Sequence, residues 1–318
     1  MTPPPPPFGR PRKKDGIDFD PALDDSELAV VRDALAQGRW IDARSLLAET
    51  GEDWDRRGHR LVVLGEGPAS AGWARDWQLA EPDSPCAAAL LACAGVFRVL
   101  RGKDSADSVR AACLTAARMA PKDPSPWLAL LILARHKGTD GEPARIFDQV
   151  RARYRDHHHA HHLMAAFLAE RQEGREDDPF HEVYEFASWA ADQAPADSPL
   201  AVLPVVAHAE RYRVLAEAGL QPRDPALSQH WTSGRARQGL KAAFNWWLEW
   251  EGEEHPRHKA DLNYLAHAKY HEGRTAEAAA LFNRIGPYAT RSPWSYPGRD
   301  PGNAFRAARD GALGLGSP

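Results

Sequence analysis

Apolar residues recur at intervals of three and four along most of this chain, which is the spacing of one face of an α-helix. The pattern begins with Leu28, Val31 and Leu35, and the polar residues 24–26 before it are suited to cap a helix. Gly38 follows at a place where glycine commonly ends a helix, and a second apolar series starts directly after it. Residues 25–50 therefore predict two helices joined by a tight turn.

The same arrangement returns further along the chain, with glycine or proline between the apolar series. No segment shows the alternation of apolar and polar residues that is typical of a strand. We therefore predict an all-α protein with little or no strand. Beyond residue 50, the clearest helices are expected at residues 85–100, 105–119, 125–137, 143–154, 158–170, 180–193, 199–218, 235–251, 259–271 and 276–285.

The two ends of the chain differ from this helical region. Residues 1–20 contain five consecutive prolines and a basic string, and they predict a disordered, extended tail. Residues 287–318 are rich in proline and glycine and predict loops with one short helix near residues 304–309. The glycine-rich stretch 65–72 lacks the lysine of a phosphate-binding loop, so we predict a plain loop there.

Three of the helix pairs carry a common set of small and large residues. Successive pairs are about 35 to 40 residues apart, near the period of the tetratricopeptide repeat. In the last pair the matching residues are Leu262, Leu265, Ala266, Tyr270, Gly273, Ala278 and Phe282, although the tyrosine lies one place late and the usual closing proline is absent. The middle pair matches at Trp127, Leu130, Leu131, Ala134, Gly138 and Phe147, and the first at Gly38, Ala43 and Leu47.

The chain therefore resembles tetratricopeptide-repeat proteins with degenerate repeats. The resemblance implies an α-α superhelix, a solenoid of antiparallel helix pairs over residues 21–286. It also implies a concave face, lined by the first helix of each pair, that binds a peptide or a segment of a partner protein. Such a surface is shallow and seldom holds catalytic groups in register, so an enzyme is the less favoured interpretation.

Composition limits the kinds of partner and the cellular compartment that we expect for this protein. The formal net charge is −4 at pH 7, which gives no overall attraction to nucleic acid or to an anionic membrane. No stretch is apolar enough to span a membrane, and the first residues lack the apolar core of a secretory signal. Cys86, Cys93 and Cys113 provide no disulfide framework. We expect a cytoplasmic protein, and the abundance of alanine and arginine indicates a bacterial one.

The most distinctive local feature is a run of histidines, His157, His158, His159, His161 and His162. Two pairs within it are four residues apart, the spacing that places two imidazoles on one helix face. Asp156 is positioned to cap this helix. A helical wheel directs residues 163, 164, 167 and 168 to the core, with His157 and His161 at its border and His158 and His162 pointing further out.

Three interpretations of this cluster remain open. They are an exposed or inter-helix packing cluster, a pH-sensitive contact, and a site for zinc or nickel. For a metal site the candidate ligands are His157, His158, His161 and His162, with a further ligand from His181 or Glu182. The pair His267 and His271, and His255 and His258 before it, are weaker candidates.

Candidates for the concave face are polar and aromatic residues on helices that otherwise carry core residues. They are Asn263, His267, His271, Trp246, Trp250 and Arg237, together with His158. The tryptophans could equally widen the apolar arc of a helix packed between two neighbours. The sequence thus predicts a non-catalytic protein that binds a protein or peptide. The alternative is a metal-binding protein or metal-dependent enzyme that uses residues 157–162.

Overall fold

The computed structural model describes residues 16–171, 181–249 and 255–315. All regular structure in this part of the chain is helical, apart from one isolated parallel bridge between Asp18 and Tyr288. The prediction of an all-α protein with little or no strand is confirmed.

The helices form pairs that follow one another in chain order. The first helices of the pairs are α1 (Ser26–Ala36), α3 (Trp54–Glu66), α5 (Pro85–Leu100), α7 (Ser125–Lys137), α9 (His158–Glu170), α11 (Leu203–Glu217) and α13 (His258–His271). Their partners are α2 (Trp40–Thr50), α4 (Ser70–Ala80), α6 (Ala106–Met119), α8 (Glu142–Arg151), α10 (Glu182–Gln193), α12 (Gly234–Glu249) and α14 (Thr275–Ile285). The helix α15 (Pro301–Ala312) packs on α14. Three short 3₁₀-helices flank α11 and α12, namely η1 (Pro199–Val202), η2 (Pro225–Leu227) and η3 (Gln229–Thr232).

Local sequence explains the first pair. The side chain of Asp25 accepts a hydrogen bond from the backbone N–H of Leu28 at 2.9 Å, which satisfies one free donor at the start of α1. Gly38 has φ +89°, a conformation that favours glycine, and a Cβ atom there would lie 3.0 Å from the ring of Trp73. The glycine therefore provides both the turn and the close approach of α4.

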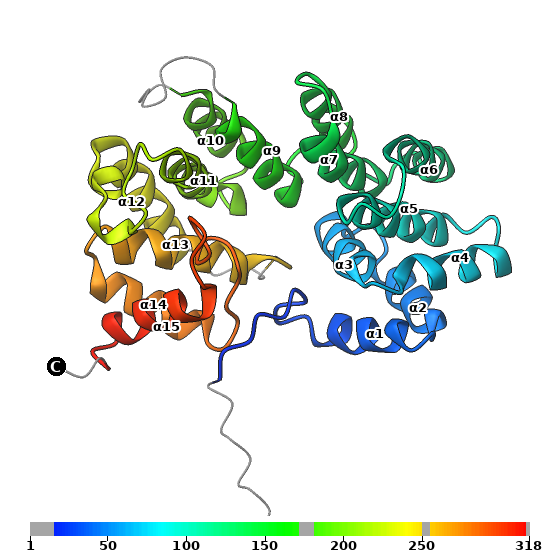
Figure 1. Cartoon of the computed structure of the whole chain (residues 1–318), viewed down its shortest axis with the longest axis horizontal. Helices are drawn as coiled ribbons and strands as arrows, with labels where there is room; N and C mark the ends of the chain where they lie inside the picture. Colours follow the sequence, from blue (N-terminus) through cyan, green and yellow to red (C-terminus); the bar gives the residue numbers. More distant parts are fainter. Residues whose placement is uncertain (1–15, 172–180, 250–254, 316–318) are drawn as a thin grey trace, which may run out of the picture.

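The helix pairs are arranged around a common centre. In Figure 1, α7 lies inside α8, α9 inside α10 and α11 inside α12, so the first helices face inward. This packing of neighbouring pairs is consistent with a helical solenoid. The curvature is tight, because α3 packs not only on α5 but also on α7 and α9. Inner helices are consequently covered on several sides.

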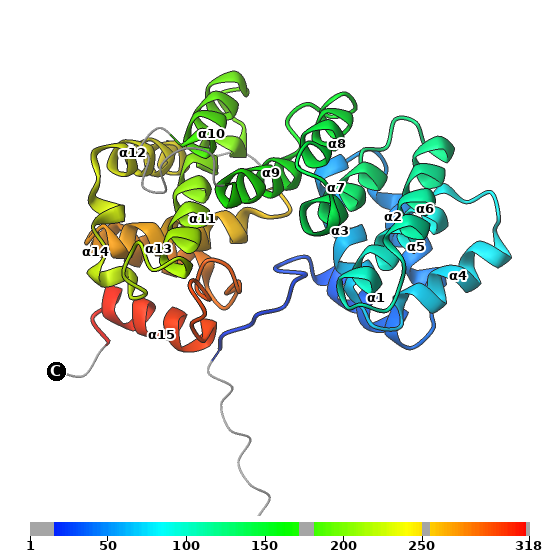
Figure 2. The same cartoon turned by 45° about the horizontal axis from the view of Figure 1, so that its top comes forward.

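The described part of the chain closes on itself. The N–H of Asp18 donates to the carbonyl of Pro287 at 2.6 Å, and the N–H of Ala289 donates to the carbonyl of Asp18 at 2.9 Å. Asp24 lies 3.2 Å from the ring of His258. Figure 2 shows the segment before α1 running from the C-terminal helices to the N-terminal ones. Of the tail predicted at residues 1–20, residues 16–20 thus lie against the C-terminal segment, and residues 1–15 lie outside the described part.

Two local predictions need correction. The stretch 65–72 is mostly helical, because Gly65 belongs to α3 and residues 70–72 to α4. A Cβ atom at Gly65 would lie 2.9 Å from the sulfur of Cys93, so this glycine serves the contact of α3 with α5 rather than a loop. The short helix expected near residues 304–309 is the longer α15, which Asp300 caps by accepting from the N–H of Asn303 at 2.7 Å. No helix in the described ranges has the length and apolar character required to span a membrane.

Candidate functional site

The histidines at the start of α9 lie inside the protein. All five are buried, and His158 and His162 are only 1% and 7% exposed. The prediction that these two point outward is therefore wrong. The wheel considered a single helix, whereas the first turns of α9 are covered by α3 and by the segment that enters α13.

The cap of α9 also comes from a distant element. Asp156, the predicted cap, makes no capping hydrogen bond. Instead Asp55 of α3 accepts a hydrogen bond from the backbone N–H of His158 at 2.9 Å, and its carboxyl lies 3.2 Å from Nδ1 of His157. Burial raises the pKa of Asp55 to about 7 and lowers the pKa of His157 to about 3, so these two groups are not a fixed ion pair near neutral pH.

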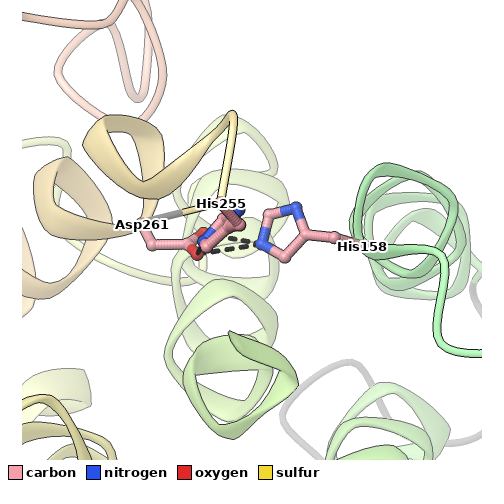
Figure 3. A group of neighbouring side chains, drawn as sticks. All are labelled: His158, His255 and Asp261. Carbon is pink, nitrogen blue, oxygen red and sulfur yellow. Dashed lines mark hydrogen bonds and ion pairs between the residues drawn. The ribbon is translucent and has the colours of Figure 1, made fainter. Parts of the chain in front are cut away.

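The centre of the site is Asp261 in the first turn of α13. As Figure 3 shows, His158 reaches across from α9 toward Asp261 and toward His255 in the segment before α13. The Nε2 atom of His158 lies 3.1 and 2.9 Å from the two carboxylate oxygens, and Nε2 of His255 lies 2.8 Å from Oδ2. His162 completes the group, with Nε2 at 3.3 Å from Oδ1. Three imidazoles therefore converge on one buried carboxylate.

Hydrogen bonding assigns the protons in this group. The Nδ1 atom of His255 accepts from the backbone N–H of Arg257 at 3.3 Å, so the neutral ring carries its proton on Nε2 and donates it to Asp261. Burial alone would raise the pKa of Asp261, but His158 and His255 and the hydrogen bonds from its imidazole neighbours lower that pKa well below the usual range. Burial lowers the pKa of His158 well below its usual value. The arrangement is an ionised carboxylate that accepts hydrogen bonds from the imidazoles around it.

The same donor set could hold a metal ion. One ligand atom from each of His158, His255 and Asp261 lies within 4.8 Å of the others. Two imidazoles and a carboxylate are ligands that zinc uses, and ligands 2.0–2.1 Å from a tetrahedral ion are roughly 3.3 Å apart. The present separations are a few tenths of an ångström shorter, so the side chains would move apart slightly. Binding of a metal ion through Nε2 would also require His255 to lose the proton on that atom, and its Nδ1 atom would have to become a donor.

The other predicted ligands are directed elsewhere. Nδ1 of His161 lies 2.9 Å from the carbonyl of His157, and its ring packs edge-on against Phe147. His181 caps α10 by accepting from the N–H of Val183, and its Nε2 lies 3.1 Å from the carbonyl of Arg171. Of the five predicted ligands, the structure brings only His158 and His162 to a common carboxylate.

Sequence reasoning missed Asp261 as a partner and ranked His255 low. One signal was available for Asp261, because a carboxylate on an inner, largely apolar helix needs hydrogen-bond donors wherever it is buried. One donor, His255, is only six residues away, but His158 is 103 residues away in α9, which no local pattern reveals.

A cavity of about 470 Å³ lies beside this group. Its walls come from segments far apart in the chain: residues 19–23, α9, α11, the segment that enters α13, and residues 289–296. Its polar lining includes Asp20, Arg135, His159, His162, Glu210, Arg257, Tyr264, Arg291 and Tyr296. Glu66 and Arg291, which also line it, are exposed, so the cavity is open to solvent on that side. We call it the inner cavity.

Two residues predicted for a concave groove are core residues instead. Asn263 is fully buried and His267 is 1% exposed, because every residue of α13 from Lys259 to Lys269 is buried between neighbouring elements. His267 lies between the rings of Trp231 and Trp294, each 5.1 Å away. His271 is partly buried against Trp231. The open groove predicted on this helix is therefore filled by protein side chains.

The remaining groove candidates lie on α12. Trp246 lines a second cavity of about 510 Å³ between α10, α11 and α12, and its indole N–H donates to the carbonyl of Ala196 at 2.8 Å. Arg237 is exposed and lines neither cavity. Trp250 lies outside the described residues. The groove candidates thus do not form one continuous surface.

Comparison with known proteins adds no family assignment. No protein-family model matches the sequence, and no curated protein has a significant match to it. The arguments about function below therefore come from the site itself.

Proposed function

We propose that this chain is a non-catalytic binding protein whose inner cavity receives a short peptide or a segment of a partner protein. The observation that carries the proposal is the cavity of about 470 Å³ lined by inner helices, by residues 19–23 and by residues 289–296. Volumes of this order are typical of sites that enclose a ligand. The proposal keeps the repeat-like role of the inner helices but replaces a shallow groove by a cavity.

The chemistry of the lining supports binding of a polar backbone or polar side chains. Hydroxyl, imidazole and guanidinium groups alternate with small residues such as Ala166 and Ala260, which leave room beside the helices. By contrast, the inner face of α13 offers no exposed polar residue between 259 and 269. A partner segment would therefore contact the cavity and not the helix faces predicted from sequence.

A selected peptide can test this proposal directly. Random heptapeptides displayed on phage are selected against the intact protein, and binding of the selected peptides is measured with Ala166→Trp, which fills the inner cavity. The matched control is Leu79→Trp on the outer helix α4, where Leu79 is 74% exposed. We expect the cavity variant to lose at least tenfold in affinity, about 1.4 kcal/mol, and the control to bind like the wild type. Equal binding by both folded variants would contradict the proposal.

The cysteines support a proposal about the cellular compartment of the protein. Cys86, Cys93 and Cys113 are all free thiols, and burial raises the pKa of the Cys113 thiol to about 12, which makes it unreactive. Free thiols are normal in a reducing compartment, and we propose on this basis and on its composition that the protein is cytoplasmic and bacterial. Mass spectrometry after alkylation of denatured protein from the native host should find three reduced cysteines.

The convergence of His158, His255 and Asp261 supports a second candidate function, that of a zinc- or nickel-binding protein. We propose that the three side chains would act as ligands, with His162 placed beside them. Elemental analysis of tag-free protein tests this candidate. A site of this kind should hold close to one metal ion per chain, and chelation should lower the melting temperature of the wild type.

Two variants separate a specific metal site from surface binding. His255→Ala should abolish metal uptake, whereas His136→Ala, at an exposed histidine, should leave it unchanged. Fewer than about 0.2 ions per chain, with a melting temperature that chelators do not alter, would refute the metal function.

A further inference from the structure

Arg257 has an unusual position beside the inner cavity. It directly precedes α13, and its half-buried side chain lines the cavity. Its Nε atom is buried without a hydrogen-bond partner. Among the described residues no carboxylate forms an ion pair with this guanidinium, and no acceptor bonds its Nη atoms. A cation is thus held inside the protein without the partner that a buried charge requires.

The carboxylates nearby are already engaged. Glu210 accepts hydrogen bonds from the hydroxyls of Tyr264 and Tyr296, at 3.0 and 2.5 Å, and it forms an ion pair with Arg213 at 3.0 Å. Asp20 forms an ion pair with Arg32. Glu210 is thus held by two hydroxyls and an arginine, and Asp20 is held by an arginine. Neither carboxylate is available to pair with Arg257.

Asp261 is engaged as well, since imidazoles of α9 and of the segment before α13 occupy both of its oxygens. The one remaining acid of the lining, Glu66, is exposed at the open side of the cavity. The guanidinium of Arg257 is therefore left without a hydrogen-bonded acceptor among the described residues, and only the charges of Asp261 and Asp55 act on it from a distance.

Further donors line the same space. The Nδ1 atom of His159 is buried and has no hydrogen-bond partner among the described residues. Arg291 is exposed at the open side and makes no side-chain hydrogen bond or ion pair within the described ranges. A ligand that enters past Arg291 would meet Arg257 at depth. Such an arrangement attracts an anion and offers the planar donor pair of a guanidinium at the end of its path.

We propose that Arg257 binds a carboxylate group of the peptide that occupies the inner cavity, so that the preferred ligand is an acidic peptide end or side chain. This inference rests on the proposed function. The charge favours a carboxylate over a phosphate, because the negative charge of Asp261 already acts on Arg257 and a singly charged ligand adds less repulsion there. A phosphate group, which carries close to two negative charges at neutral pH, would bury an excess charge.

The test compares the binding of a small carboxylate ligand with that of its uncharged amide. N-acetyl-Ala-Ala with a free C-terminal carboxylate, the corresponding amide, and inorganic phosphate are titrated into the intact protein at constant ionic strength. Binding is followed by NMR at the Nε–Hε resonance of Arg257, which is assigned by its loss in Arg257→Lys. We expect a saturable shift with the free acid, with a Kd of about 1 mM, and no shift with the amide. Phosphate should bind at least threefold more weakly.

Variants establish whether the guanidinium is the binding group. Arg257→Lys should weaken binding of the acid at least tenfold, because it loses the paired donors, whereas Arg237→Lys on the exposed face of α12 should bind like the wild type. Arg257→Gln should lose binding without a lower melting temperature, since it removes a guanidinium that has no hydrogen-bond partner in the fold. Equal shifts with acid and amide, tighter binding of phosphate, or a lower melting temperature with unchanged binding would each overturn the inference.

Failure of the carboxylate-binding role of Arg257 can be distinguished from failure of the proposed peptide-binding function. If selected heptapeptides lose affinity for Ala166→Trp but keep it for Arg257→Lys, the cavity binds peptides and the role of Arg257 is wrong. If the dipeptide acid binds through Arg257 while selected peptides ignore the cavity variant, the carboxylate site stands and the peptide-binding function is wrong.

Discussion

The side-chain oxygen of Asn263 accepts a hydrogen bond from the indole N–H of Trp294 at 2.7 Å, and so ties the C-terminal segment to the centre of α13. The same amide donates to the carbonyls of Lys259 and Tyr288 at 2.7 and 2.9 Å, and it accepts from the N–H of Thr290 at 3.3 Å. These four interactions satisfy the full capacity of an asparagine side chain. Asn263 therefore anchors residues 288–294 and does not face a groove.

Replacement of Asn263 by alanine should destabilise the fold. The variant leaves the indole N–H of Trp294 buried without an acceptor, and we expect a loss of about 3 kcal/mol in the free energy of unfolding. Urea denaturation followed by tryptophan fluorescence measures this loss. His271→Ala, at the partly buried end of the same helix, is the comparison and should cost less. Asn263→Ala with wild-type stability would restore the groove interpretation.

A second prediction concerns the stability that the contact between Asp55 and His158 contributes. Asp55→Ala removes the only observed side-chain cap of α9 and should lower the free energy of unfolding by about 1 to 2 kcal/mol. Because burial raises the pKa of Asp55 to about 7, the carboxyl is largely protonated at pH 6, and the neutral Asp55→Asn should then lie within about 0.5 kcal/mol of the wild type.

Asp156 provides the matched control for this cap. The sequence pattern placed the cap there, yet Asp156 makes no capping hydrogen bond, so Asp156→Ala should leave stability within about 0.5 kcal/mol. Chemical denaturation of the three variants at pH 6 decides between the two positions. A larger loss for Asp156→Ala than for Asp55→Ala would show that the local cap is the real one.

Local signals predicted most of the helices, with α3 and α4 as exceptions, because caps and turns are short-range. Asp25 caps α1, and Gly38 and Gly273 have positive φ at the ends of α1 and α13, as a reader of the sequence expects. These features depend on residues within one turn of each other. Helix positions could therefore be predicted without knowing which helices become neighbours.

Burial of the polar residues could not be predicted in the same way. A helical wheel assumes one covered face, but α9 is packed by α3, α7, α8, α10 and α11, and α13 is covered along residues 259–269. The polar groups on these inner helices became core residues, such as Asn263 and His158, once distant segments supplied their partners. The inner cavity depends on the same distant contacts, and so no local pattern points to it.

Asp261→Asn tests the charge at the centre of the histidine group. The amide retains one acceptor oxygen but presents N–H groups to imidazoles that donate, and it removes the buried charge that they stabilise. In the presence of a chelator we expect a loss of about 2 to 4 kcal/mol in the free energy of unfolding. Asp148→Asn, at an exposed position on α8, should change stability by less than about 0.5 kcal/mol. Equal stability of the two variants would mean that the carboxylate is not ionised in the folded protein.

The buried histidines should make the protein sensitive to acid. Burial lowers the pKa of His59, His157 and His271 to about 3 and that of His161 and His230 to about 4. An unfolded chain has histidine pKa values near about 6.5 and so binds protons that the folded protein excludes. Stability is therefore complete above about pH 6.5 and falls below it, by about 1.4 kcal/mol per pH unit for each histidine. Asp55, whose pKa is raised to about 7, acts in the opposite direction and offsets about one histidine.

Because a domain is stable by about 5 to 15 kcal/mol, this slope predicts cooperative unfolding between about pH 5.5 and 4.5, measurable by near-ultraviolet circular dichroism. His267→Leu is the decisive variant. Both ring nitrogens of His267 lack hydrogen-bond partners among the described residues, and burial lowers the pKa of the ring well below its usual value. Relative to the wild type, His267→Leu should gain about 1 kcal/mol on going from pH 7.5 to 5.5, whereas His136→Leu, at a more exposed ring whose pKa burial lowers less strongly, should gain less. An identical pH dependence for wild type and His267→Leu would mean that this ring is already protonated, or accessible to protons, in the folded state.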